Sequence, residues 1–77
     1  MALKDLATFI VKRLADKPES VSVDESMDGG AVVLALNVDE GDKGKVIGKQ
    51  GKVIKAIRAV VGAAAQKAGQ RAIVEID

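Results

Sequence analysis

The residues best suited to chemistry lie in one basic, glycine-rich stretch, Gly44 to Ile54 (GKVIGKQGKVI). Gly48 and Gly51 stand three residues apart, a spacing that lets the backbone turn sharply and approach another molecule without a Cβ in the way. Three lysines lie in or beside this turn: Lys45, Lys49 and Lys52. Ammonium groups suit phosphate oxygens, and the start of the following helix adds partial positive charge. The stretch therefore predicts an anion-binding turn between two helices.

Two other phosphate-binding motifs do not fit this stretch. The P-loop has four residues between its glycines and then Gly-Lys-Ser/Thr, whereas Gly44 and Gly48 enclose three residues and Gln50 stands in place of the hydroxyl. The dinucleotide fingerprint Gly-x-Gly-x-x-Gly is also missing from the sequence. Nucleotide-dependent catalysis is therefore not expected.

The composition excludes several further classes of site. The chain has no cysteine and no histidine, which rules out disulfides, thiolate or imidazole metal ligands, and Ser-His or Cys-His nucleophilic pairs. Paired carboxylates suited to acid–base catalysis are not apparent either. We therefore expect a protein without enzymatic activity, metal or cofactor.

Charge is divided unevenly along the chain, although the formal net charge is only +1. Residues 1–42 hold nine acidic and four basic residues, whereas residues 43–77 hold eight basic and two acidic ones. A run of like charge is often only a solvated face. Here the basic residues surround a glycine turn, which favours a polyanionic partner such as a nucleic acid.

The N-terminal segment has the periodicity of an amphipathic helix. Its apolar stripe consists of Leu3, Leu6, Ala7, Ile10, Val11 and Leu14. Pro18 disfavours helix in the residue before it, so this helix is expected to end near Asp16. Phe9, the only aromatic residue, is expected on the opposite side. Charged residues interrupt the stripe, so it is not a signal peptide, and no segment resembles a bilayer span; a soluble, cytoplasmic protein is expected.

Two strands joined by a hairpin are expected next. Val21, Val23 and Met27 alternate with polar residues, as in a strand with one wet face. Asp28-Gly29-Gly30 suits a tight turn. Ala31 to Val38 is the most apolar strand and is therefore placed inside the sheet.

Two helices and a strand complete the chain. Asp42 is the predicted N-cap of a short helix at about 43–48, and a longer helix is predicted from Lys52 to about Ala68, ended by Gly69. Arg71 to Ile76 is the predicted last strand. The residues expected to face the core from these two elements are Val53, Ile54, Ile57, Val61, Ala64, Ala68, Ala72, Val74 and Ile76.

The order helix-strand-strand-helix-helix-strand predicts an α+β fold in one domain, residues 1–77, with a three-stranded sheet packed against three helices. The stretch Val46 to Gly51, followed by Val53 and Ile54, resembles the signature of the KH domain, whose Gly-x-x-Gly loop clamps about four nucleotides. The element order is similar to the type II KH arrangement. The Lys17-Pro18-Glu19 helix ending and the run from Gly44 to Arg58 resemble the KhpA family of stand-alone bacterial KH proteins.

The resemblance implies a single-stranded RNA-binding protein that acts in the cytoplasm as an RNA chaperone or post-transcriptional regulator, with an effect on cell shape. It also implies a homodimer or a heterodimer with a larger KH-containing partner, and no small-molecule substrate. The residues expected to contact RNA are Lys45, Ile47, Gly48, Lys49, Gln50, Gly51, Lys52, Ile54, Lys55 and Arg58. For Lys55 and Arg58, a solvated position without RNA contact is an equal alternative. For Ile47 and Ile54, the equal alternative is burial in the core.

A second hypothesis makes the protein chiefly an assembly module that holds a protein partner. A flank of small residues lies beside the core stripe of the long helix: Ala56, Ala59, Val60 and Ala63, of which Ala56, Val60 and Ala63 are the candidate interface residues. Such residues permit close approach of another helix and are the expected dimer contact, although they equally fit good helix propensity.

Overall fold

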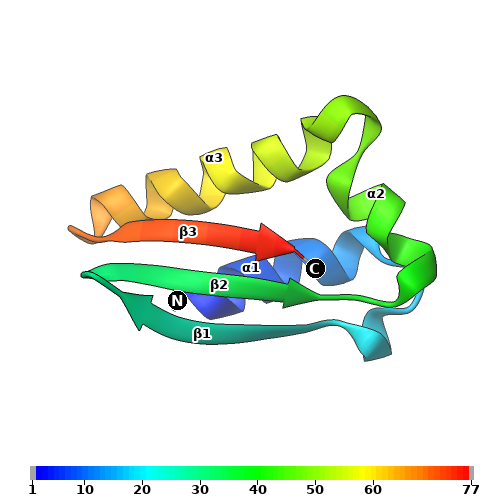
Figure 1. Ribbon diagram of the computed structural model, residues 1–77, viewed down its shortest axis with the longest axis horizontal. Coiled ribbons are helices and arrows are strands. Elements are labelled where there is room, and N and C mark those ends of the chain that lie inside the picture. Colours follow the sequence, from blue (N-terminus) through cyan, green and yellow to red (C-terminus); the bar gives the residue numbers. More distant parts are fainter. Residues whose placement is uncertain (1, 77) are drawn as a thin grey trace.

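In the computed structural model, which describes residues 2–76, three strands form one mixed sheet in the order β1-β2-β3 (Figure 1). β1 (Ser22–Asp28) runs antiparallel to β2 (Ala31–Asn37), and β3 (Arg71–Ile76) runs parallel to β2 on its other side. The most apolar strand is therefore the central one, as predicted.

The predicted hairpin between β1 and β2 is confirmed. Asp28 pairs with Ala31, which leaves Gly29 and Gly30 as a two-residue turn. Their φ angles of 57° and 87° are both positive, as a type I′ turn requires. This turn fixes a register in which Val23 and Leu36 face each other and contribute to the core.

Helices cover one face of the sheet. α1 (Leu3–Leu14) and α3 (Lys52–Lys67) pack against each other and against the strands, while the short α2 (Lys43–Ile47) lies beyond the end of β2 (Figure 1). Single 3₁₀ turns occupy Pro18–Ser20, Glu40–Asp42 and Lys49–Gly51. The predicted α+β fold, with three α-helices and a three-stranded sheet, is confirmed.

The hydrophobic core lies between the two layers. Its largest fully buried side chains are Val11, Leu34, Leu36, Val46 and Val61. In α3 the buried stripe differs from the prediction, because Ala65 is fully buried while Ala64 is half-buried and Ala68 is exposed. Ile57, Val61 and Ala65 follow one another at intervals of four residues, so the stripe drifts around a helix of 3.6 residues per turn.

Two further details of the prediction were wrong. α1 ends at Leu14, two residues early, because the N–H groups of Asp16 and Lys17 bind the Asp42 carboxylate instead of helical carbonyls. Met27 is 64% exposed although it was expected to face in. It lies on an edge strand near the hairpin tip, where the strands continue past the start of α1 (Figure 1).

Candidate nucleic-acid interface

The predicted glycine turn joins α2 to α3 at one end of the molecule (Figure 1). α2 stops at Gly48, whose φ and ψ are 79° and 170°, and a single 3₁₀ turn follows before α3 begins. Gln50 and Gly51 also have positive φ, 58° and 75°. The N–H of Gly51 donates to the carbonyl of Gly48 at 3.1 Å, which closes the turn.

The two glycines are required for different reasons. A Cβ on Gly48 would lie 2.4 Å from Cγ2 and 2.7 Å from the backbone nitrogen of Val53, so the chain passes directly against the first turn of α3. A Cβ on Gly51 would meet nothing closer than 3.9 Å, and only its left-handed backbone favours glycine there. Gly48 thus sets the approach of α2 to α3, and Gly51 sets the direction in which the helix starts.

Polar side chains project from the turn into solvent. Lys49, Gln50, Lys52 and Lys55 are all exposed. The N–H groups of Gly51 and Lys52 are already used inside the turn, by Gly48 and Lys49. Lysine side chains and the positive end of the α3 dipole therefore carry most of the attraction for an anion here.

Most of the other predicted contact residues are restricted, because they contact other parts of the protein. The Nζ of Lys45 forms an ion pair with the carboxylate of Asp16, and the Nε of Arg58 donates to the carbonyl of Val74 in β3 at 3.1 Å. Ile54 is 5% exposed and belongs to the core, whereas Ile47 is 36% exposed beside the turn. The structure thus brings the exposed lysines and Ile47 together around the turn, with Ile54 beneath it.

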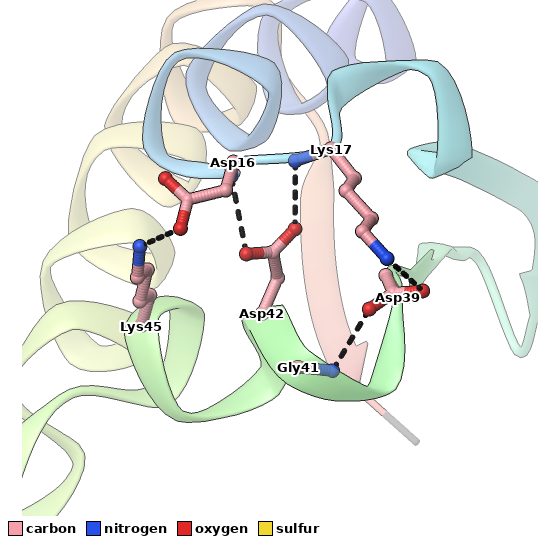
Figure 2. A network of polar contacts seen from close by, with 6 residues as sticks. All are labelled: Asp16, Lys17, Asp39, Gly41, Asp42 and Lys45. Carbon is pink, nitrogen blue, oxygen red and sulfur yellow. Dashed lines mark hydrogen bonds and ion pairs between the residues drawn. The ribbon is translucent and has the colours of Figure 1, made fainter.

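A polar network that the sequence did not predict holds α2 against the end of α1 (Figure 2). Asp42 is 3% exposed. Its Oδ1 accepts from the N–H of Asp16 at 3.1 Å and its Oδ2 from the N–H of Lys17 at 3.0 Å. The hydrogen bonds from Lys17 and Asp16 lower the pKa of Asp42 below its ordinary value.

Asp42 thus has the position of the predicted N-cap of α2 but not its function, since its side chain caps nothing in that helix. Asp39 takes a capping role one turn earlier: its Oδ2 accepts from the N–H of Gly41 at 3.0 Å, and its Oδ1 lies 3.8 Å from the Nζ of Lys17. The signal in the sequence was that Asp42 is the last acidic residue before the long basic run. Its partners, however, are backbone groups 25 and 26 residues away, which side-chain patterns do not reveal.

A second surface feature is an apolar groove of about 420 Å³ between α1 and α3. Its lining residues are Leu6, Phe9, Ile10, Leu14, Val53, Ala56, Ile57 and Val60. Phe9 was expected on the side of α1 away from the apolar stripe, but it lies at the flank of that stripe and faces the groove. Ala56 and Val60 of the predicted dimer contact line the groove; Ala63 is exposed on the same helix.

The arrangement as a whole suits binding rather than catalysis. The turn offers mobile cations and a helix N-terminus, both of which attract an anion without any bond being made or broken. Within residues 2–76, none of the helices has the length and apolar character needed to cross a bilayer.

Comparison with known proteins agrees with this geometry. Residues 4–76 match the model of the KhpA/KhpB KH domain. The chain is 50% identical over 74 residues to a protein of Clostridium perfringens named RNA-binding protein KhpA, covering 96% of this chain and 99% of that one. A protein of the same name from Aquifex aeolicus is 41% identical over 75 residues, covering 97% and 95% of the two chains. No solved structure matches the chain significantly. From the extent of the family match and these identities, we conclude that the chain belongs to the KhpA/KhpB family of KH-domain proteins, a non-enzymatic family.

Proposed function

We propose that this protein binds single-stranded RNA, with the Gly48–Gly51 turn gripping the phosphate backbone. The observation that carries the proposal is the exposed Lys49-Gln50 pair, held at the tip of a turn that starts a 16-residue helix. Lys52 and Lys55 add positive charge along the same helix, and the segment from Lys43 through Val74 contains no carboxylate to repel phosphate. The RNA-binding names of its relatives support the same ligand.

The binding surface offers no aromatic side chain on which bases could stack, because Phe9 lies in the α1–α3 groove. Stacking on aromatic residues is worth about 1–3 kcal/mol per base in many single-strand binders. Ile47, at 36% exposure, is the apolar side chain nearest the turn in sequence that RNA bases can reach. We therefore expect one copy of the protein to bind weakly, with strong salt dependence and little sequence preference, in keeping with an RNA chaperone or post-transcriptional regulator of the cytoplasm.

The double substitution Lys49→Asp with Gln50→Asp tests the site. Both residues are exposed, and aspartate tolerates the positive φ of position 50, so the fold should remain intact. Two carboxylates at the turn would repel phosphate, and titration of a labelled single-stranded RNA should show loss of binding. An RNA hairpin stem of matched length should bind the wild type more weakly, because its bases are already stacked and paired.

A matched control carries the same charge change elsewhere. Lys4→Asp with Gln70→Asp alters two exposed positions outside the turn, one in the first turn of α1, where an acid is well tolerated. This control should keep most of the RNA affinity. Equal loss in both double variants would indicate a diffuse charge effect, and unchanged affinity in a folded Lys49→Asp, Gln50→Asp protein would refute the proposed site.

The α1–α3 groove supports a second function, assembly with another protein chain. Phe9 and Val60 are 55% and 50% exposed at its rim, so a partner could bury apolar side chains on both helices there. A second copy of this chain, or a larger KH-containing protein, is the partner that we propose for it. The two functions are compatible, since pairing two RNA-binding turns would raise avidity through effective concentration.

A further inference from the structure

Among the ion pairs of the described residues 2–76, Lys45 is the one predicted contact residue whose ammonium group is already engaged by a carboxylate. It lies three residues before Gly48, about one turn of α2 from the glycine turn. Its partner Asp16 belongs to the segment that follows α1, and the two side chains meet across the junction shown in Figure 2. Both are accessible: the Lys45 side chain is 50% exposed and that of Asp16 is 72% exposed. A phosphate can therefore reach the same ammonium group that Asp16 holds.

Asp16 is held in this position by its backbone. The N–H of Asp16 and that of Lys17 both donate to Asp42, whose carboxylate is buried and fixes the segment against α2. The Nζ of Lys17 is drawn to Asp39 on the far side of Asp42, which leaves Lys45 as the cation beside Asp16 (Figure 2). Because the backbone is already fixed, the ion pair forms with a smaller loss of conformational entropy than a free surface pair would.

We infer that Asp16 limits the RNA affinity of this protein by competing with the phosphate backbone for Lys45. The inference rests on the proposed function, since it concerns the same turn. To contact RNA, Lys45 must exchange the carboxylate of Asp16 for a phosphate. The unpaired Asp16 carboxylate then remains close to the incoming negative charge. Both consequences oppose binding, so removal of the Asp16 charge should strengthen it.

The expected size of the effect is modest, because the pair is exposed to solvent. Ion pairs of this kind are usually weak, and we expect Asp16→Asn to bind single-stranded RNA about two- to fivefold more tightly at low salt. Wild-type complexes in which Lys45 stays with Asp16 lack this phosphate contact, so freeing Lys45 should also add up to one contact on average. The slope of log affinity against log salt should then become steeper by up to about 0.7.

Asp16→Asn should leave the fold unchanged, because the backbone N–H that binds Asp42 is retained. Two further variants show whether charge is the cause. Asp16→Glu keeps the charge and should bind like the wild type. Glu19→Gln removes one charge from an exposed position in the neighbouring 3₁₀ turn and should change the affinity less than Asp16→Asn does.

The decisive experiment is a double-mutant cycle with Lys45→Met, measured by titrating a short labelled single-stranded RNA at several salt concentrations. Asp16→Asn should strengthen binding clearly more in the wild-type background than with Lys45→Met, where only the repulsion between Asp16 and phosphate remains to be removed. An effect of the same size in both backgrounds, or one in the wild-type background no larger than that of Glu19→Gln, would overturn the inference. If the Lys49→Asp, Gln50→Asp variant binds like the wild type, the proposed function fails; if only the cycle fails, the site stands and Asp16 does not regulate it.

Discussion

The Asp42 carboxylate lies between the end of α1 and the start of α2, with each of its oxygens accepting one backbone N–H. A buried carboxylate is stable only when hydrogen bonds replace its lost hydration. Here those hydrogen bonds also tie together two segments that are distant in the sequence. The same residue therefore stabilises the fold and sets the position of α2, from which the glycine turn extends.

The pH dependence of folding should report this carboxylate. Its pKa is lowered in the folded protein, so its contribution to stability is present above the ordinary aspartate value of 3.8 and is lost as pH falls through the lower folded value. Asp42→Asn should reduce the free energy of urea unfolding at neutral pH. The difference from wild type should shrink below pH 3.8, and a difference that stays constant in strong acid would contradict the assigned ionisation.

At the scale of elements, the turn between α2 and α3 combines two kinds of backbone constraint. Gly48 occupies a region of φ and ψ that is essentially restricted to glycine, and it also presses against Val53. Gly51 occupies the left-handed helical region, where other residues are costly but tolerated. The path of the chain into α3 is therefore set by these two backbone conformations.

Alanine substitutions should separate the two constraints. We expect Gly51→Ala to lower the free energy of unfolding by about 1–2 kcal/mol, the cost of a left-handed alanine. Gly48→Ala should cost more, because its Cβ meets both the side chain and the backbone nitrogen of Val53. Gly62→Ala is the control: its Cβ would meet nothing within 4 Å inside α3, and it should stabilise the protein by about 0.5–1 kcal/mol. Urea unfolding of the three variants measures this order, and equal costs at positions 48 and 51 would contradict it.

The elements themselves were largely predictable because their signals are local. Apolar periodicity placed the helices and the central strand, and Gly29-Gly30 identified the hairpin. What the sequence did not reveal depends on how elements meet. Met27 has the right alternation but is exposed near the end of an edge strand, and Ala65 is buried although Ala64 was the predicted core residue.

The candidate site likewise has features that the local sequence predicts and features that depend on residues far apart in the chain. Gly48 and Gly51 were recognisable from their spacing together with the flanking lysines and apolar residues, and their positive φ angles and the close approach at Gly48 explain why glycine stands there. The engagement of Lys45 by Asp16 was not, because it joins residues 29 apart through side chains that are ordinary surface charges in the sequence. The periodicity left open whether Ile54 lies in the core or contacts RNA. Its burial shows that it belongs to the core.

At the scale of the whole molecule, the basic turn and the apolar groove are neighbouring surfaces that meet at Val53. Figure 1 places the glycine turn at the end of the molecule where α2 lies, while the groove runs between α1 and α3. Phe9, Leu14 and Val60 leave apolar side chains exposed there, at 55%, 37% and 50%. A chain of this size gains stability when such surface is buried against a partner.

The protein should therefore self-associate, and Val60→Asp should shift it toward monomer by placing an unpaired charge in the contact. Val60 is half exposed, so the substitution should leave the monomer folded, whereas Val61 is fully buried and an acid there would disrupt the core. Gln70→Asp adds one negative charge at an exposed position outside the groove and serves as the control. Sedimentation equilibrium at several concentrations should give a wild-type and control mass above the monomer value of 8.0 kDa and a lower mass for Val60→Asp. A wild-type mass that stays at the monomer value up to high concentration would exclude a second copy as the occupant and leave a different protein as the partner of this groove.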